Sequence, residues 1–153
     1  MSKRREGRET AVQLLFSREF SPREGEHDVP GFFQLHTARS DVRTHAERLY
    51  LGVVERLEEL DALIVPVLEN FSLERLDGVD RNIIRVALYE MHHCLEVPPI
   101  VAISEAIEIA KRYGGDQSAR FINGVLDKLK SGVQRSLREA VAPARPARPK
   151  DAS

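Results

Sequence analysis

Basic side chains gather in the first eight residues of this sequence. Lys3, Arg4, Arg5 and Arg8 face only two acidic residues within the first ten positions. On a helix, Arg4 and Arg8 lie one turn apart and share a face. Cations at the start of a helix oppose its macrodipole, so this locally unfavourable choice indicates a role elsewhere, such as contact with a phosphate backbone. The alternative interpretation is a frayed, solvated terminus.

A second candidate site follows the Gly-Gly pair at positions 114 and 115, in the segment DQSARF. Backbone N–H groups at a helix start can bind an anion, and Arg120 adds a positive charge. Phe121 offers a ring on which an unstacked base could stack, an interaction worth about 1–3 kcal/mol. Phe121 also precedes Val125 by one helical turn, and periodicity alone favours this core interpretation.

An acidic block separates these two basic sites. Residues 40–80 carry four basic and ten acidic residues, whereas residues 130–153 carry six basic and two acidic ones. The net charge of −1 is therefore an average over segments of opposite sign. The block is either a solvated helical face or a docking surface for a basic partner, and periodicity does not decide between them.

Motifs for catalysis and metal binding are missing. The sequence contains no GxGxxG, GxxxxGK[ST], HExxH or GxSxG. His92, His93 and Cys94 are consecutive, so on a helix they point about 100° apart and do not converge on one ion. A single cysteine also excludes an intramolecular disulfide and a Cys-rich zinc site. We expect no enzyme, no metal, no cofactor and no small-molecule substrate.

The elements that must position the candidate sites are helical, because apolar residues recur at intervals of three and four along most of the chain. Capping residues, prolines and glycines predict the helix boundaries. In the first half of the chain, a first helix is ended by Pro22 and Gly25, and a long one is capped by Ser40 or Asp41, restarts at Asp61 and is broken at Pro66. A short helix follows Ser72, the next begins at Asp80 and stops at Pro98, another ends at Gly114, and a last one is capped by Asp116 or Ser118 and continues toward Leu137. Residues 21–39 have no clear period.

These patterns predict an all-α protein with one helical domain of about six or seven helices over residues 1–139. Its 153 residues, 42% of them hydrophobic, suffice for one core. Three prolines and several basic residues mark residues 140–153 as a disordered tail rich in Pro, Arg and Ala. Neither a signal peptide nor a membrane-spanning run is present, so we expect a cytoplasmic protein that makes no membrane contact.

Three segments stand in this order along the chain: RREGRETAVQLLFS, RNIIRVALYEM and VPPIVAISEAIEIAKRYGGDQSARFINGVLDKL. In this combination the chain resembles the NusB family of bacterial transcription antitermination factors. The third segment is similar to the family's VAINEAIELAK…FVNGVLDK nearly position for position. The resemblance implies an all-helical domain without catalytic activity that binds the boxA element of ribosomal RNA leaders together with ribosomal protein NusE. It further implies that the complex joins RNA polymerase and helps it read through terminators.

The resemblance also implies which residues carry these contacts. The RNA-binding residues would be Lys3, Arg4, Arg5, Arg8, Ser118, Arg120 and Phe121. The NusE-binding residues would be Phe16, Glu74 and Asp80. The chain departs from the family at Phe16, where a tyrosine is common, and at Ala119, which replaces a more polar residue. A related helical domain is fused to ribosomal RNA cytosine methyltransferases, but that enzyme needs a second domain for which 153 residues leave no room.

The function expected from the sequence is therefore that of an RNA-binding adaptor. Three rivals remain open. A purely protein-binding helical module would use the acidic and apolar faces without nucleic acid. A DNA-binding helix-turn-helix protein would need a recognition helix with several basic or amide side chains on one face, which is not evident. An enzyme is disfavoured by the missing motifs.

Overall fold

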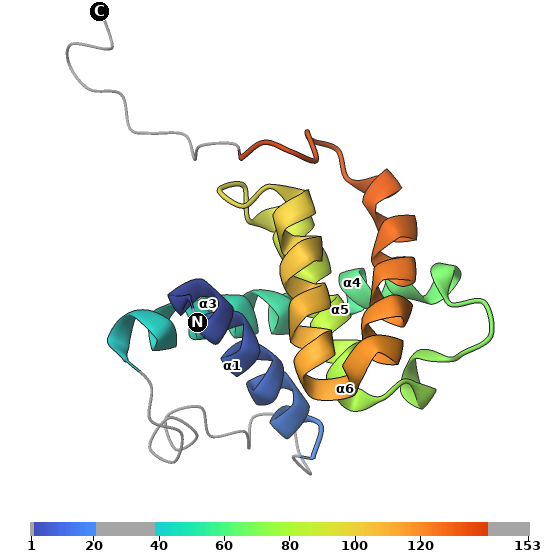
Figure 1. Cartoon of the computed structure of the whole chain (residues 1–153), viewed down its shortest axis with the longest axis horizontal. Helices are drawn as coiled ribbons and strands as arrows, with labels where there is room; N and C mark the ends of the chain where they lie inside the picture. The colour runs from blue at the N-terminus through green and yellow to red at the C-terminus, as the bar shows by residue number, and fades with distance from the viewer. Residues whose placement is uncertain (1, 21–38, 141–153) are drawn as a thin grey trace, which may run out of the picture.

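Helices make up all the regular structure that the computed structural model describes, which covers residues 2–20 and 39–140 (Figure 1). Expectations for residues 21–38 and for the tail beyond residue 140 lie outside this described part. The α-helices are α1 (Lys3–Arg18), α3 (Ser40–Glu55), α4 (Leu57–Ile64), α5 (Gly78–His93) and α6 (Pro99–Leu129). Three short 3-10 helices span Val65–Val67, Leu73–Arg75 and Lys130–Gly132. The all-α prediction is confirmed.

Helix α1 begins where Ser2 accepts a hydrogen bond from the backbone N–H of Arg5 at 3.1 Å. It lies alongside the first half of α6 and runs in the same direction (Figure 1). Polar contacts tie the two helices together at successive turns: Arg5 to Glu105 at 2.5 Å, Arg112 to Glu9 at 3.0 Å, and Gln13 to Tyr113 at 2.9 Å. The N-terminal basic cluster is thereby fixed against a helix about 100 residues later in sequence.

Helix α5 lies in the middle of the hydrophobic core. Its buried side chains include Ile84, Leu88 and Met91, all fully enclosed. They pack in one cluster with apolar residues of every other α-helix, among them Leu14, Leu49, Leu60 and Ile122. Burial of such a side chain stabilises the fold by about 1.5–3 kcal/mol relative to exposure. This core holds the ends of α1, α5 and α6 in fixed relative positions.

A sharp bend divides α6. Gly115 adopts φ 75° and ψ −166°, a conformation that is essentially restricted to glycine. The second half of α6 therefore turns back along the molecule (Figure 1). Its Ile122 and Leu126 are fully buried in the same core cluster as the apolar residues of α5. The sequence predicted two helices separated near Gly114. The structure has this break one residue later, at the non-helical Gly115, and the label α6 covers the helices on both sides of it. Among the described residues, the five labelled α-helices are fewer than the predicted six or seven.

Other boundaries also differ from expectation. The long helix restarts at Leu57, because Arg56 leaves helical geometry (φ −117°, ψ 22°), and not at Asp61. Helix α3 follows Arg39, which makes no side-chain cap. Asp77 caps α5 by accepting from the backbone N–H groups of Val79 and Asp80. None of the described helices has the length and apolar content needed to cross a membrane.

After α6 and the 3-10 helix Lys130–Gly132, the chain leaves helical geometry at Val133 and does not continue as a helix toward Leu137. Arg135 instead reaches the C-terminal end of α5. Its guanidinium donates to the carbonyl oxygens of Met91 and Cys94 at 3.0 Å each, of Glu90 at 3.1 Å and of Val97 at 2.7 Å. Backbone carbonyls at a helix end lack intrahelical hydrogen-bond donors, and the side chain of Arg135 donates to several of these carbonyls here.

Candidate functional site

The N-terminal basic cluster divides into exposed and buried members. Lys3 and Arg4 are exposed. Lys3 forms an ion pair with Asp41 at 2.8 Å, and the two side chains are 59% and 47% exposed, respectively. Arg5 is partly exposed and pairs with Glu105. Arg8 is only 3% exposed and bonds to the carboxylate of Glu90. The expectation that Arg8 contacts RNA directly does not fit this interior position.

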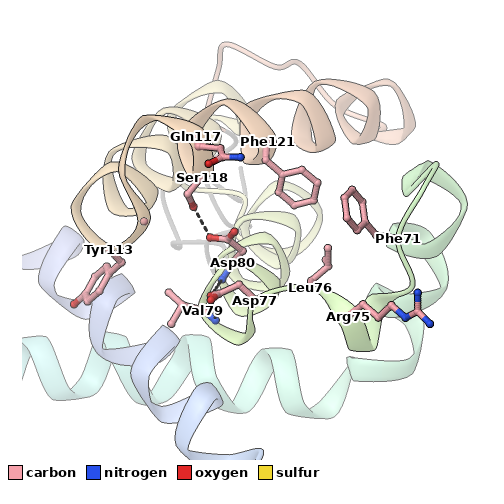
Figure 2. Close-up of a pocket in the computed structure, with 11 residues that line it drawn as sticks. Phe71, Arg75, Leu76, Asp77, Val79, Asp80, Tyr113, Gln117, Ser118 and Phe121 are labelled. Carbon is pink, nitrogen blue, oxygen red and sulfur yellow. Dashed lines mark hydrogen bonds between the residues drawn. The ribbon is translucent and has the colours of Figure 1, made fainter.

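A cavity of about 450 Å³ lies between the first turn of α5 and the bend of α6 (Figure 2). Asp80 comes from α5, and Ser118 and Phe121 come from the second half of α6. The remaining lining residues are Phe71, Arg75, Leu76, Asp77, Val79, Tyr113, Gly114 and Gln117. The cavity therefore unites a residue expected to contact NusE with two expected to contact RNA.

The hydroxyl of Ser118 donates a hydrogen bond to the carboxylate of Asp80 across the inner end of this cavity (Figure 2). Burial raises the pKa of Asp80, whereas the Ser118 hydrogen bond lowers it. A Cβ at Gly114 would lie 2.6 Å from the Ser118 Cβ, so the glycine permits this close approach. Ser118, 9% exposed, thus fastens the bend of α6 to α5.

Phe121 faces Phe71 across the opposite side of the cavity (Figure 2). The ring centroids are 6.0 Å apart and the planes make an angle of 78°, an edge-to-face arrangement. Phe121 is partly buried against the core, while Phe71 is 53% exposed. Phe121 therefore combines both interpretations of the sequence, because its ring packs on the core and also lines the cavity.

Arg120 is exposed one residue earlier. It lines a smaller cavity of about 250 Å³ on another side of the bend, together with Lys111, Asp116 and Asn123. Two basic side chains thus flank the bend. Asn123 and Gly124, which belong to the same sequence motif, are both exposed, and a Cβ at Gly124 would contact nothing within 4 Å.

The residues expected to contact NusE lie around the start of α5. Phe16 packs edge-on against Phe20 at 5.1 Å, and a Cβ at Gly78 would come within 2.7 Å of its ring. Glu74 is exposed in the 3-10 helix that precedes α5. Phe16 and Asp80 therefore border the first turn of α5, with Glu74 just before it in the chain.

Sequence reasoning missed two aromatic residues of this site, Phe71 and Tyr113. Phe71 stands in the polar segment NFS, outside any apolar stripe, and single apolar residues of this kind are common on protein surfaces, so the sequence offers no signal for its role. Tyr113 is 42% exposed and precedes the two glycines of the bend. Among the described residues, no group of three metal-binding side chains converges.

The comparison with known families decides the identity of this arrangement. The model of the NusB family matches residues 5–131, a range that includes both cavities together with Arg5 and Arg8 of the basic cluster. The chain belongs to the NusB family. The resemblance seen in the sequence is confirmed.

NusB proteins of several bacteria are similar to this chain over most of their length. The transcription antitermination protein NusB of Desulfotalea psychrophila is 41% identical over 143 residues, which cover 88% of this chain and 100% of that protein. The NusB of Geobacillus kaustophilus is 41% identical over 136 residues, or 87% of this chain and 99% of that protein.

Solved structures of NusB share the fold. A T. maritima NusB structure superimposes with a TM-score of 0.72 at 38% identity, covering 84% of this chain and 90% of that one. A structure of the antitermination factors NusB and NusE in complex with dsRNA gives a TM-score of 0.74 at 24% identity, covering 86% and 98%. At that lower identity the likeness shows the fold alone.

Proposed function

We propose that this NusB-family protein is a transcription antitermination factor of the bacterial cytoplasm. It binds the boxA RNA of ribosomal RNA leader transcripts together with NusE, and the complex promotes read-through by RNA polymerase. Curated relatives at about 41% identity carry the name transcription antitermination protein. A structure of the same fold contains NusB with NusE and dsRNA, and the proposal extends these partners to this chain.

The observation that carries the proposal is the hydrogen bond between Asp80 and Ser118. Asp80 belongs to the proposed NusE side, and Ser118 to the proposed RNA side. Because their side chains touch, the two surfaces meet at one cavity and a bound NusE would border the RNA path. Such a composite surface makes each partner increase the affinity for the other.

On the RNA side, the exposed charges of Lys3, Arg4 and Arg120 neutralise phosphates, and Arg5 contributes its exposed part. These contacts release counterions, so the affinity depends on salt concentration. Phe121 presents its ring to a base of a single-stranded segment, where unstacked bases can be read. Arg8 acts indirectly, by fixing the start of α1 through Glu90.

On the protein side, exposed carboxylates around the start of α5 attract a basic ribosomal protein. Glu74 is exposed and Asp80 lines the cavity, whereas Phe16 supplies apolar contact next to them. Charge complementarity of this kind accelerates association and fixes orientation.

A titration of boxA RNA and of a scrambled RNA, each with and without NusE, tests the proposal. We expect NusE to strengthen binding of boxA far more than binding of the scrambled RNA. Equal binding of both RNAs in the presence of NusE would refute it.

The variant Phe121→Ala tests the stacking role. We expect an RNA affinity loss of about 1–3 kcal/mol with helicity retained. Phe71→Ala is the matched control for the fold, because it removes the same edge-to-face contact from the other partner. If Phe121→Ala loses helicity together with RNA affinity while Phe71→Ala keeps its helicity, the ring of Phe121 serves the fold and the stacking role is wrong.

A further inference from the structure

A separate cavity of about 280 Å³ lies between the first turn of α1 and helix α3. Its lining residues are Lys3, Arg4, Asp41, His45 and Arg48. Three of these carry a positive charge and one a negative charge, and Asp41 is paired with Lys3. With a neutral imidazole at His45, the cavity has a net positive charge. Its volume far exceeds the roughly 30 Å³ of one water molecule, so a polyatomic anion has room.

His45 is the unusual member of this set. Its Nε2 atom is buried and has no hydrogen-bond partner among the residues that the structure describes. A Cβ at Gly7 would lie 2.6 Å from the imidazole Cδ2, so the glycine lets the ring lie close against α1. A buried polar atom without a partner costs about 1–3 kcal/mol, and a bound ion that completes its bonding is one explanation for such an atom.

The charges around His45 are mostly positive. Burial is the main cause that lowers its pKa to about 4; the guanidinium groups of Arg8, Arg4 and Arg48 contribute to this lowering in that order, and Glu96 opposes it. The imidazole is therefore uncharged at neutral pH, although it stands within a basic environment. An anion entering this environment would be attracted by the arginines and would reverse the electrostatic effect on the ring.

We propose that this cavity is a phosphate subsite of the RNA surface, in which Arg4 and Arg48 bind a backbone phosphate and His45 Nε2 hydrogen-bonds to it. The inference rests on the proposed function and extends its surface from α1 onto α3. Lys3 and Arg4 belong both to the N-terminal cluster and to this cavity, so the two are continuous. Guanidinium groups match the geometry of phosphate oxygens.

Arg48 must exchange one partner for another when the phosphate arrives. In the structure it pairs with Glu96, with side chains 47% and 26% exposed. Exposed ion pairs of this kind are worth about 0–1 kcal/mol, so a phosphate can displace the carboxylate at little cost. Glu96 is therefore a competitor of the RNA for Arg48.

Two variants with opposite expected effects test this competition in boxA titrations with NusE present. Arg48→Gln should weaken RNA binding about five- to tenfold and lower the slope of log K against log salt by about 0.7, the value for one phosphate contact on a single strand. Glu96→Gln should instead strengthen binding, because it frees Arg48. Lys130→Gln removes an equal charge beyond the end of α6 and should leave the affinity unchanged.

If Arg48→Gln and Glu96→Gln shift the affinity in the same direction, the ion pair is structural and the subsite is refuted. An unchanged affinity in Arg48→Gln refutes it as well. A weakening by Lys130→Gln equal to that of Arg48→Gln would show general charge attraction and also overturn the proposal.

The pKa of His45, followed by NMR of its ring, provides a readout that separates this inference from the proposed function. A bound phosphate favours the imidazolium, so boxA RNA should raise this pKa by at least about one unit. Specific boxA binding with an unchanged His45 pKa would refute the subsite and leave the function standing. Equal affinity for boxA and scrambled RNA, with the His45 pKa raised by both, would refute the function and leave the subsite standing.

Discussion

Arg8 and Glu90 form a two-point ion pair in the interior of the protein. Nε of the arginine lies 2.8 Å from one carboxylate oxygen, and a terminal nitrogen lies 3.0 Å from the other. Their side chains are 4% and 1% exposed. Arg8 also approaches Glu105 on α6 at 3.8 Å. One arginine of the N-terminal cluster therefore joins α1 to both α5 and α6.

We expect Arg8→Ala to lower the free energy of unfolding by about 3–5 kcal/mol, because the carboxylate of Glu90 would remain buried without a partner. Urea denaturation measures this loss. Arg4→Ala removes the same charge from an exposed position and should cost less than about 0.5 kcal/mol. Equal stabilities of the two variants would contradict the structural role of Arg8.

The deficit of Arg8→Ala should depend on pH. Burial raises the pKa of Glu90, and Arg8 opposes that rise. Without Arg8 the folded-state pKa rises further, and a group with a raised pKa stabilises the fold at low pH and loses that contribution as pH increases. The variant should therefore be closer to wild-type stability at pH 5 than at pH 8, as measured by denaturation at both values.

The bend at Gly115 offers a matched pair of glycine substitutions. A Cβ at either Gly115 or Gly124 would meet no atom within 4 Å, but only Gly115 has a positive φ. Gly115→Ala should destabilise the protein by about 1–3 kcal/mol through backbone strain. Gly124→Ala should instead stabilise it by about 0.5–1 kcal/mol, because alanine favours a helix. A shift of the melting temperature in the same direction for both would disprove the assignment.

Arg135 connects the C-terminal segment to the end of α5. Arg135→Ala should cost about 1–3 kcal/mol, because carbonyl oxygens at that helix end lose a charged donor. Hydrogen exchange should then increase at Ile100, whose backbone N–H donates to the carbonyl of Leu137 at 2.8 Å. Arg138→Ala, at an exposed neighbouring position, is the control and should change neither quantity. Unaltered exchange at Ile100 would speak against this connection.

Cys94 should be inert in the folded protein. Burial raises the pKa of its thiol to about 12, and the residue is 1% exposed. The thiolate is the reactive form, so modification by a disulfide reagent at pH 8 should be at least about 100-fold slower than in urea-unfolded protein. Similar rates in both states would show that the thiol is accessible.

Periodicity and capping were sufficient to predict the helical class and most of the helix order. They failed where a local choice depends on tertiary contacts. The two glycines after Tyr113 predicted a helix end at the first of them, because both suit that position. In the structure, Gly114 stays helical and lies in close contact with Ser118, and the residue with the non-helical backbone angles is Gly115. Likewise, the helical periodicity does not predict that the Arg135 side chain contacts the C-terminal end of α5.

The candidate site was predicted in part. The motif predicted Ser118, Arg120 and Phe121 as neighbours on one helix. That Asp80 meets Ser118 depends on how the bend of α6 packs against α5, a contact between residues 38 positions apart. Burial also cannot be read from charge. Arg4 and Arg8 share a helical face in the sequence pattern, yet only Arg8 finds a buried carboxylate at Glu90.

The parallel contact of α1 with α6 has a consequence for synthesis on the ribosome. The partners of Arg5 and Gln13 are encoded 100 residues later. At about 5–20 residues per second, the emerging first helix waits roughly 5–20 s before its partner helix is translated. Its apolar side chains, such as Ala11, Leu14 and Leu15, can pack earlier, because α3 and α5 are translated before α6. The basic end of the protein is thus the earliest part to be made, and its polar contacts with α6 are among the last to form.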